Sequence, residues 1–277
     1  MKRMLITGSN GFIGKNLKEF YSDKYEIYAA LREDIGVALI NFKPDIVISA
    51  AAEVYDETKM LESNYFYTKD ILDYCSKFNV EKLILFGSSS IYGRKSHPIS
   101  ETDAINPESQ YERYKAYGLE LAQGYSKKFG TNTTFINPFT VVGRYEKERK
   151  LFPVLYKKYL NKEALQLAEG THDFVFIDNF LLAFDAILNY QEQNKFNVIN
   201  IGSGAQYSNL EVVRAFEEIL DYEYLIEHIG KIRPQDSDCW VSNPEKLLTK
   251  YGIDVKIDLV EGVRKFIQDC RNLKLYE

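Results

Sequence analysis

Cysteine is scarce in this chain, with 3 among 277 residues. Cys75, Cys239 and Cys270 are far apart, and their spacing does not match that of a metal site. An odd number of isolated cysteines also argues against a disulfide framework. We therefore expect reduced thiols in a cytoplasmic protein, and no metal site.

Long apolar runs and an excess of positive charge are missing as well. No stretch approaches the roughly 20 apolar residues of a membrane-spanning helix, so we expect no association with a membrane. The formal net charge of −5 argues against a nucleic-acid-binding surface as the main function. The first residues, MKRMLITGSNG, lead directly into an apolar run and a glycine loop, so we expect no signal peptide.

The first half of the chain alternates short apolar runs with segments of helical period. Such runs are typical of buried parallel strands, and they occupy residues 4–7, 26–31, 45–49, 82–86 and 133–136. Helical patterns cover residues 12–20, 58–79 and 107–129, and we expect the last helix to begin at Pro107. This alternation predicts an α/β fold with a doubly wound parallel sheet of the Rossmann type.

After Pro138 the alternation becomes looser. We expect helices over residues 150–160, 179–190, 208–220, 243–250 and 258–271, and strands over 174–177 and 197–201. These elements predict a smaller α/β substrate-binding lobe that is interwoven with the first domain. The expected division assigns residues 1–145 with 174–202 to a dinucleotide-binding domain, and 146–173 with 203–277 to the lobe.

A glycine-rich loop follows the first predicted strand and opens the first predicted helix. Its sequence TGSNGFIG has the spacing G-x-x-G-x-x-G, which lets backbone N–H groups and a helix N-terminus face a pyrophosphate. A tight turn alone would also explain the glycines, but the position at the start of a parallel sheet favours nucleotide binding. The residues assigned to this site are Gly8, Asn10, Gly11, Phe12, Ile13 and Gly14.

The end of the second predicted strand bears on the choice of dinucleotide. An acidic residue there would bind the ribose hydroxyls of NAD, whereas this strand ends Ala30-Leu31-Arg32. A guanidinium at this position suits the 2′-phosphate of NADP. Alternatively, Arg32 is a solvated strand end beside Glu33 and Asp34. We favour NADP(H) as the cofactor and keep NAD(H) as the alternative.

Tyr111 and Lys115 lie four residues apart in a predicted helix. With 21 tyrosines and 35 lysines and arginines in the chain, this spacing is expected to occur by chance. The motifs that accompany it indicate that the pair is functional. Together with TGSNGFIG, SAAAEV, GSSSIYG and YERYK, the chain resembles the extended short-chain dehydrogenase/reductase family, and within it the nucleotide-sugar 4-epimerases and 4-ketoreductases. The segments NPFTVVG, HDFVFIDN, NIGSG and RPQDSD resemble further sequence motifs of that family, and they occur in the expected order.

The resemblance implies a catalytic set of Ser88, Tyr111 and Lys115. Tyr111 would exchange a proton with the sugar oxygen, and Ser88 would hydrogen-bond that oxygen. Lys115 would lower the phenol pKa and hold the nicotinamide ribose. The resemblance also implies that Ala50, Ala51, Ala52 and Pro138 line the dinucleotide, that Asn64 braces the active site, and that Ser89, Ser90, Asn137 and Arg233 contact the nucleotide-sugar substrate.

The same resemblance narrows the reaction. Sugar 4,6-dehydratases of the family carry Thr-Asp-Glu where this chain has Ser88–Ser90, so dehydration is not expected. Reduction coupled to epimerisation uses a cysteine and a histidine, whose places hold Ser90 and Lys150. An NADPH-dependent 4-ketoreductase and an NAD-dependent 4-epimerase remain, and Arg32 favours the reductase. A non-catalytic dinucleotide sensor is a third alternative, which the Tyr-Lys pair disfavours.

Two further expectations concern assembly and the stretch after Arg32. The helices over 58–79 and 107–129 resemble the pair that forms a homodimer interface in the family. The stretch between Arg32 and Asp45 is short, as if one crossover strand had been trimmed, and this leaves the adenine contacts open.

Overall fold

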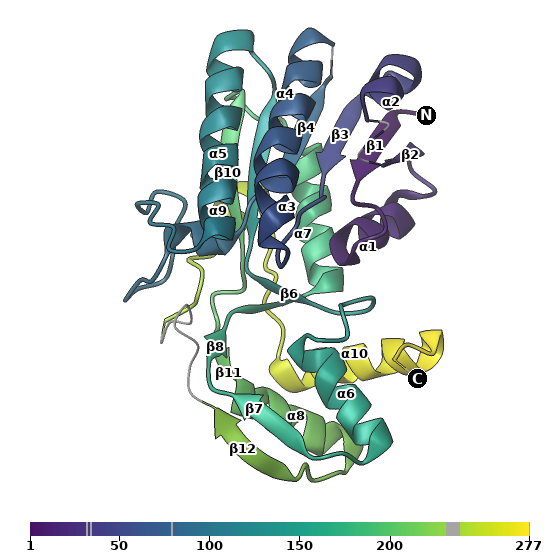
Figure 1. The fold of residues 1–277 in the computed structure, drawn as a ribbon, viewed down its shortest axis with the longest axis vertical. Coiled ribbons are helices and arrows are strands. Elements are labelled where there is room, and N and C mark those ends of the chain that lie inside the picture. The colour runs from purple at the N-terminus through teal and green to yellow at the C-terminus, as the bar shows by residue number, and fades with distance from the viewer. Residues whose placement is uncertain (32, 34, 79, 231–238, 277) are drawn as a thin grey trace. The chain divides into compact units, whose positions relative to one another are not determined.

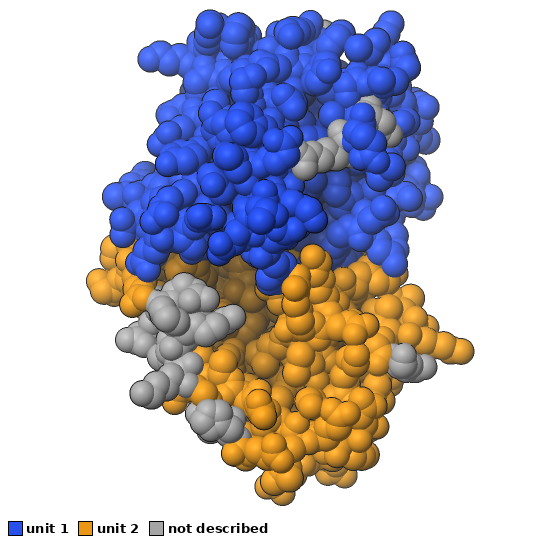
Figure 2. All heavy atoms as spheres, viewed as in Figure 1, with its two compact units in different colours: residues 1–93, 101–138, 184–200 blue, residues 94–100, 139–183, 201–277 orange. Residues whose placement is uncertain are grey.

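The computed structural model describes residues 1–31, 33, 35–78, 80–230 and 239–276. It divides into two compact units, which Figure 2 shows in different colours. Unit 1 contains residues 1–93, 101–138 and 184–200, and unit 2 contains residues 94–100, 139–183 and 201–277. Two of these boundaries, at 138 and 200, lie near the division expected at 145 and 202. No described helix is long and apolar enough to cross a bilayer.

Unit 1 is built on a six-stranded sheet with the order β10-β5-β4-β3-β1-β2. The strands are β1 (Arg3–Thr7), β2 (Glu26–Ala30), β3 (Ile46–Ser49), β4 (Lys82–Phe86), β5 (Thr133–Pro138) and β10 (Phe196–Ile201). All pairings from β2 to β5 are parallel. Strands β3 and β4 are buried throughout because they are continuous apolar runs between helical layers. The predicted α/β fold with a parallel sheet is confirmed.

Helices cover both faces of this sheet. They are α1 (Phe12–Tyr21), α2 (Ile35–Phe42), α3 (Glu57–Leu61), α4 (Tyr67–Lys77), α5 (Gln110–Phe129) and α7 (Ile177–Asn189). Figure 1 shows α4 and α5 side by side on one face. On the other face, Phe86 stacks on Phe184 of α7, and the Lys82 ammonium donates to three carbonyls at the end of that helix, those of Ile187, Leu188 and Tyr190.

Three local expectations need correction. The segment expected as one helix over 58–79 consists of α3, a π-helical turn η1 (Glu62–Phe66) and α4. Helix α5 begins at Gln110 and not at Pro107, because Ser109 and Glu112 form a capping box. The short stretch before β3 contains α2, a helix of 8 residues, as the connection from β2.

Unit 2 combines small sheets with four helices of its own. Its strands are β6 (Thr140–Val142), β7 (Leu165–Ala168), β8 (Thr171–His172), β9 (Phe174–Phe176), β11 (Tyr207–Ser208) and β12 (Ile226–Gly230). Its helices are α6 (Leu151–Asn161), α8 (Asn209–Leu220), α9 (Glu245–Tyr251) and α10 (Leu259–Leu273), and α7 begins here as well. The short strands β6–β8, β11 and β12 were not predicted, because none of them forms a continuous apolar run of four or more residues.

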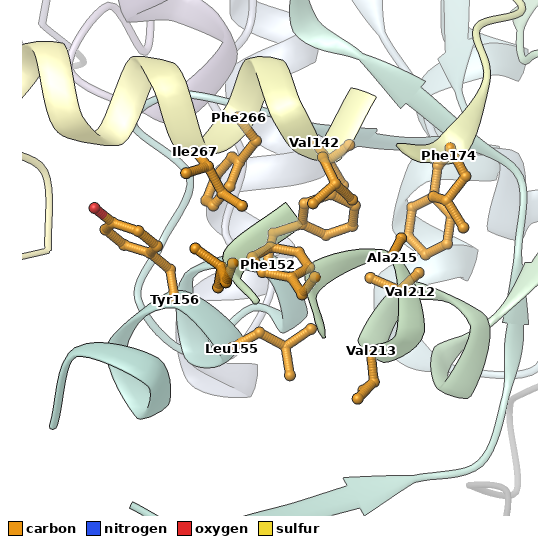
Figure 3. Packing of buried hydrophobic residues seen from close by; sticks show 14 of the residues in the cluster. Val142, Phe152, Leu155, Tyr156, Phe174, Val212, Val213, Ala215, Phe266 and Ile267 are labelled. Carbon is orange, nitrogen blue, oxygen red and sulfur yellow. The ribbon is translucent and has the colours of Figure 1, made fainter. Parts of the chain in front are cut away.

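Phenylalanine dominates the core of unit 2. Phe152 of α6 lies in the middle of the cluster in Figure 3, with its ring centroid 5.4 Å from those of Phe216 and Phe266. Phe174 and Phe176 of β9 complete the ring contacts at 5.5 and 5.8 Å. Edge-on and tilted packing of this kind adds to the burial of apolar area, and it gives unit 2 a core of its own.

Candidate active site

The glycine loop connects β1 to α1 at the point where β2 and β3 lie on opposite sides of β1. Gly8 has φ +67°, and a Cβ there would lie 2.7 Å from the backbone nitrogen of Ala51. A Cβ on Gly14 would collide with the Gly8 carbonyl. Gly11 is the N-cap of α1 without a side-chain cap, so no side chain occupies the N–H groups of the first turn. This is the backbone arrangement that binds a pyrophosphate.

A cavity of about 210 Å³ lies at this edge of the sheet. Ends of three strands contribute to it, as expected at the switch point of a doubly wound sheet. Its lining residues are Gly8, Ser9, Asn10, Ala30, Leu31, Ala51, Ala52, Glu53, Ser63 and Tyr67. Four of the residues assigned to the dinucleotide therefore share one cavity, whereas Ser63 and Tyr67 from the next helical layer were not predicted.

The other residues assigned to the cofactor are not among those that line this cavity, or they lie outside the described part of the chain. Phe12 and Ile13 form the first turn of α1 and are half-buried, and Ala50 follows β3 directly. Pro138 ends β5. Arg32 and Asp34, on which the preference for NADP depends, lie outside the described residues.

Ser88 follows β4 and caps a short 3-10 helix, η2 (Ser89–Tyr92). Its hydroxyl oxygen accepts from the backbone N–H of Ser90 at 3.2 Å and lies 2.8 Å from the Ser90 hydroxyl. Its own N–H donates to Oδ1 of Asn137 at 3.2 Å. The three predicted serines therefore differ in their surroundings. Ser90 contacts the Ser88 hydroxyl, whereas Ser89 is buried.

Tyr111 and Lys115 come from consecutive turns at the start of α5. The capping box at Ser109 fixes where the helix begins and therefore which way Tyr111 points. The Lys115 ammonium is buried and donates to the Phe86 carbonyl at 2.8 Å, at the end of β4. It lies 5.9 Å from the centroid of the Tyr111 ring. Ser88, Tyr111 and Lys115 therefore meet at the carboxyl end of β4.

Burial sets the protonation states of this group. It raises the pKa of Tyr111 to about 12, while the side-chain hydrogen bond with Ser88 acts in the opposite direction. Burial also lowers the pKa of Lys115 to about 8. Burial therefore outweighs the hydrogen bond with Ser88 at Tyr111, whereas the sequence led us to expect that Lys115 lowers this pKa. At neutral pH the phenol carries its proton and the amine is mostly an ammonium.

A network of buried polar side chains holds Asn137, which in turn binds the backbone of Ser88. The Nδ2 of Asn137 donates to the Tyr92 hydroxyl at 3.2 Å, and that hydroxyl donates to Oδ1 of Asn200 at 2.9 Å. Glu101 accepts from the backbone N–H of Asn200 at 2.9 Å. Asn137, assigned to substrate from the resemblance, is fully buried, and in this structure its side chain positions Ser88. Tyr92 and Asn200 were not predicted, because they meet only through packing of β5 against β10.

In unit 2, Asp173 binds Ser242, which follows the predicted substrate-binding segment RPQDSD in the sequence. Its carboxylate accepts from the N–H and hydroxyl groups of both Ser203 and Ser242 and from the Gly204 N–H, at 2.6–3.1 Å. Burial raises the pKa of this carboxyl, and the hydrogen bonds from Ser203 and Ser242 act in the opposite direction. Arg233, assigned to the substrate diphosphate, lies outside the described residues.

Comparison with known proteins identifies sequence relatives. A sequence model of the NAD dependent epimerase/dehydratase family matches residues 4–202. An uncharacterized UDP-glucose epimerase of Bacillus subtilis is 24% identical, and the alignment covers 89% of this chain and 92% of that protein. A GDP-6-deoxy-D-talose 4-dehydrogenase of Aggregatibacter actinomycetemcomitans is also 24% identical, over 99% of both chains.

Solved structures show the same fold. The UDP-glucuronic acid 4-epimerase from Bacillus cereus, in complex with UDP-glucuronic acid and NAD, has a TM-score of 0.89 at 22% identity, covering 98% of this chain and 99% of that chain. A dTDP-glucose 4,6-dehydratase from Bacillus anthracis, in complex with NAD, has a TM-score of 0.87 at 19% identity, covering 98% and 97%.

Proposed function

Because the chain belongs to the NAD dependent epimerase/dehydratase family, we propose that it reduces the C4 keto group of a nucleotide-activated sugar or deoxysugar with NADPH. Bound NADPH would supply a hydride to C4, while Tyr111 donates its proton to the keto oxygen and regains a proton from solvent, which gives the alcohol. Ser88 hydrogen-bonds that oxygen, and Lys115 holds the nicotinamide ribose. The observation that carries the proposal is the grouping of Ser88, Tyr111 and Lys115 at the carboxyl end of β4, where the Lys115 ammonium binds the Phe86 carbonyl and lies 5.9 Å from the centroid of the Tyr111 ring.

A 4-epimerase first oxidises C4, so its tyrosine has to start the cycle by accepting a proton, whereas the tyrosine of a reductase starts as a donor. Arg32, which suits the 2′-phosphate of NADP, favours the reductase. The B. cereus epimerase binds NAD, which keeps the NAD-dependent epimerase as the second candidate. A non-catalytic sensor has no use for the ordered Ser88–Tyr111–Lys115 group, and this group argues for an enzyme.

The cofactor proposal gives a prediction at Arg32. We expect NADPH to bind more tightly than NADH, and Arg32→Asp to reverse the order. An arginine–phosphate pair near the surface contributes about 1–3 kcal/mol, or roughly ten- to a hundred-fold in preference. Dissociation constants for both dinucleotides, measured by fluorescence titration, test this.

Lys18→Asp makes the same charge change two turns into α1 and is the matched control, because Lys18 is exposed. This variant should retain the wild-type preference. Tightly held NAD in the purified protein, with interconversion of UDP-sugars and no net consumption of reductant, would instead establish the epimerase.

We also propose that the chain forms a homodimer through the segment formed by α3, η1 and α4 together with α5. This face bears a groove of about 690 Å³ lined by Leu61, Tyr65, Tyr117, Glu120, Leu121, Gly124, Tyr125, Lys128 and Phe129. Tyr117 is 45% and Phe129 is 49% exposed. Both residues lie on α5, and Leu61 of α3 beside them is 40% exposed. Large exposed apolar residues on adjacent elements are typical of an interface between copies, and the family resemblance points to the same region.

Gly124 allows a specific test of this dimer. A Cβ at Gly124 meets no atom within 4 Å, so Gly124→Arg fits the isolated subunit but blocks close approach of a partner helix. Light scattering should give about twice 32.1 kDa for the wild type and one subunit mass for Gly124→Arg. Gln123→Arg adds the same charge at the neighbouring exposed position and should remain dimeric. A wild-type mass of one subunit at micromolar concentration contradicts the proposal.

A further inference from the structure

The side chain of Asn137 bridges the two ends of the short helix η2. Its Oδ1 accepts the backbone N–H of Ser88, which caps η2, and its Nδ2 donates to the hydroxyl of Tyr92, the last residue of η2, both at 3.2 Å. The amide reaches Ser88 beside Gly87, where a Cβ would lie 2.1 Å from Oδ1 of Asn137. Asn137 therefore ties η2 to the end of β5 at a point where a side chain on residue 87 would block the contact.

Tyr92 and Asn200 set the orientation of this amide. Oδ1 of Asn200 accepts from the Tyr92 hydroxyl at 2.9 Å and from Nδ2 of Asn137 at 3.3 Å. In the reverse orientation, Oδ1 of Asn137 would face another acceptor at Asn200, and its Nδ2 would face the N–H donor of Ser88. The Tyr92 hydroxyl accepts from one amide and donates to the other, so it orients both.

These three side chains are almost completely enclosed. Tyr92, Asn137 and Asn200 are 1%, 0% and 2% exposed, and the backbone N–H of Asn200 donates to Oε1 of Glu101 at 2.9 Å. Compared with apolar packing, a buried polar cluster of this kind contributes little net stability, but it imposes one arrangement of its hydroxyl and amide groups.

The arrangement ends at the serine that we assign to the reaction. The bond from the Ser88 N–H to Asn137 fixes the backbone of Ser88 and, with it, the direction in which the hydroxyl points. A displacement of about 1 Å at a reacting group can cost roughly 10²-fold in rate. The bonds of Tyr92 and Asn200 to Asn137 therefore bear on the reaction, although neither residue touches Ser88 itself through a hydrogen bond that the described residues form.

We propose that Tyr92 and Asn200 are positioning residues for the reaction: they orient the Asn137 amide, which holds Ser88 where its hydroxyl binds the keto oxygen of the sugar. Neither is a catalytic residue, because the Tyr92 hydroxyl is buried and bonded to two amides. This inference rests on the proposed function and extends it to side chains that do not touch the reacting atoms.

The test is a double-mutant cycle between Tyr92→Phe and Ser88→Ala. The probes are GDP-4-keto-6-deoxymannose, dTDP-4-keto-6-deoxyglucose and UDP-4-keto-6-deoxyglucose, and the cycle uses the one that the wild type reduces fastest with NADPH. Tyr92→Phe keeps the buried ring and should lower kcat roughly tenfold, with KM and the dissociation constant of NADPH within about twofold of the wild type. In the Ser88→Ala background the same change should alter kcat less than about twofold, because the hydroxyl that it positions is absent.

Asn137→Ala is the second variant, since it removes the amide through which Tyr92 acts. It should lower kcat at least as much as Tyr92→Phe does, and the addition of Tyr92→Phe should then change kcat less than about twofold. Circular dichroism of each variant checks that the fold persists.

Tyr224→Phe is the matched control, because Tyr224 is also buried and its hydroxyl donates to the Leu155 carbonyl at 2.7 Å, within unit 2. Both substitutions remove one buried hydrogen bond and should lower the midpoint of thermal unfolding by a few degrees, but Tyr224→Phe should leave kcat within about twofold of the wild type.

A kcat of Tyr92→Phe close to the wild-type value overturns the inference while the proposed function stands. So does a tenfold loss that persists in full in the Ser88→Ala background, or an equal loss in Tyr224→Phe. If the wild type reduces none of the three 4-keto sugars, both the proposed function and the role of Tyr92 fail.

Discussion

Tyr111→Phe is expected to lower kcat at least roughly 10²-fold, the scale of general-acid catalysis by a positioned side chain. The substitution removes only the hydroxyl that donates the proton and accepts the Ser88 contact. Because the ring remains in place at the start of α5, the dinucleotide cavity keeps its lining residues. We therefore expect the dissociation constant for NADPH to change little, so that the loss appears in the chemical step. Stopped-flow oxidation of NADPH with a 4-keto nucleotide sugar measures that step.

Tyr114→Phe is the matched control for this variant. Tyr114 lies on the same helix, and its ring centroid is 6.4 Å from that of Tyr117, on the face assigned to the dimer. Removing its hydroxyl should leave kcat within about twofold of the wild type, as for a surface change. Turnover of Tyr111→Phe close to the wild-type level would show that another group supplies the proton, and the assignment of the acid would be wrong.

The features that could be predicted from the sequence are local ones. The strands β1, β3 and β4 appear as continuous apolar runs because both of their faces are buried. The glycine loop and the Tyr111–Lys115 spacing are also local, since each lies within one turn or one helix. The start of α5 was predicted at Pro107 and lies at Gln110, although Ser109 and Glu112 have the spacing of a capping box.

The features that were missed depend on packing between distant segments. Tyr92 and Asn200 are 108 residues apart and share a hydrogen bond only because β10 lies next to β5. Tyr67 lines the dinucleotide cavity and directly follows a π-helical turn, which the spacing of apolar residues does not predict. The sequence shows the neighbouring lysine, which was expected to lower the pKa of Tyr111, but it does not show the burial that raises this pKa.

The rate of reduction should fall as the pH rises above about 8, the pKa to which burial lowers Lys115. The ammonium is present below this pH and is lost above it, whereas Tyr111 keeps its proton up to about pH 12. Both groups are therefore in the form needed for reduction only below about 8. We expect kcat/KM for NADPH to be level near neutrality and to fall roughly tenfold per pH unit above the break, about 100-fold by pH 10. Initial rates in overlapping buffers measure this profile.

Lys115→Met identifies the group responsible for the break. This variant should have low activity at every pH and no break near 8, while circular dichroism at each pH checks that the fold persists. In Tyr111→Phe the break should remain visible in the binding of NADPH, since Lys115 is unchanged. The direction of the slope also separates the two candidate reactions. An epimerase has to begin with an ionised phenol, so its activity would rise with pH toward the pKa of Tyr111, and a rising profile between pH 8 and 10 would exclude the reductase.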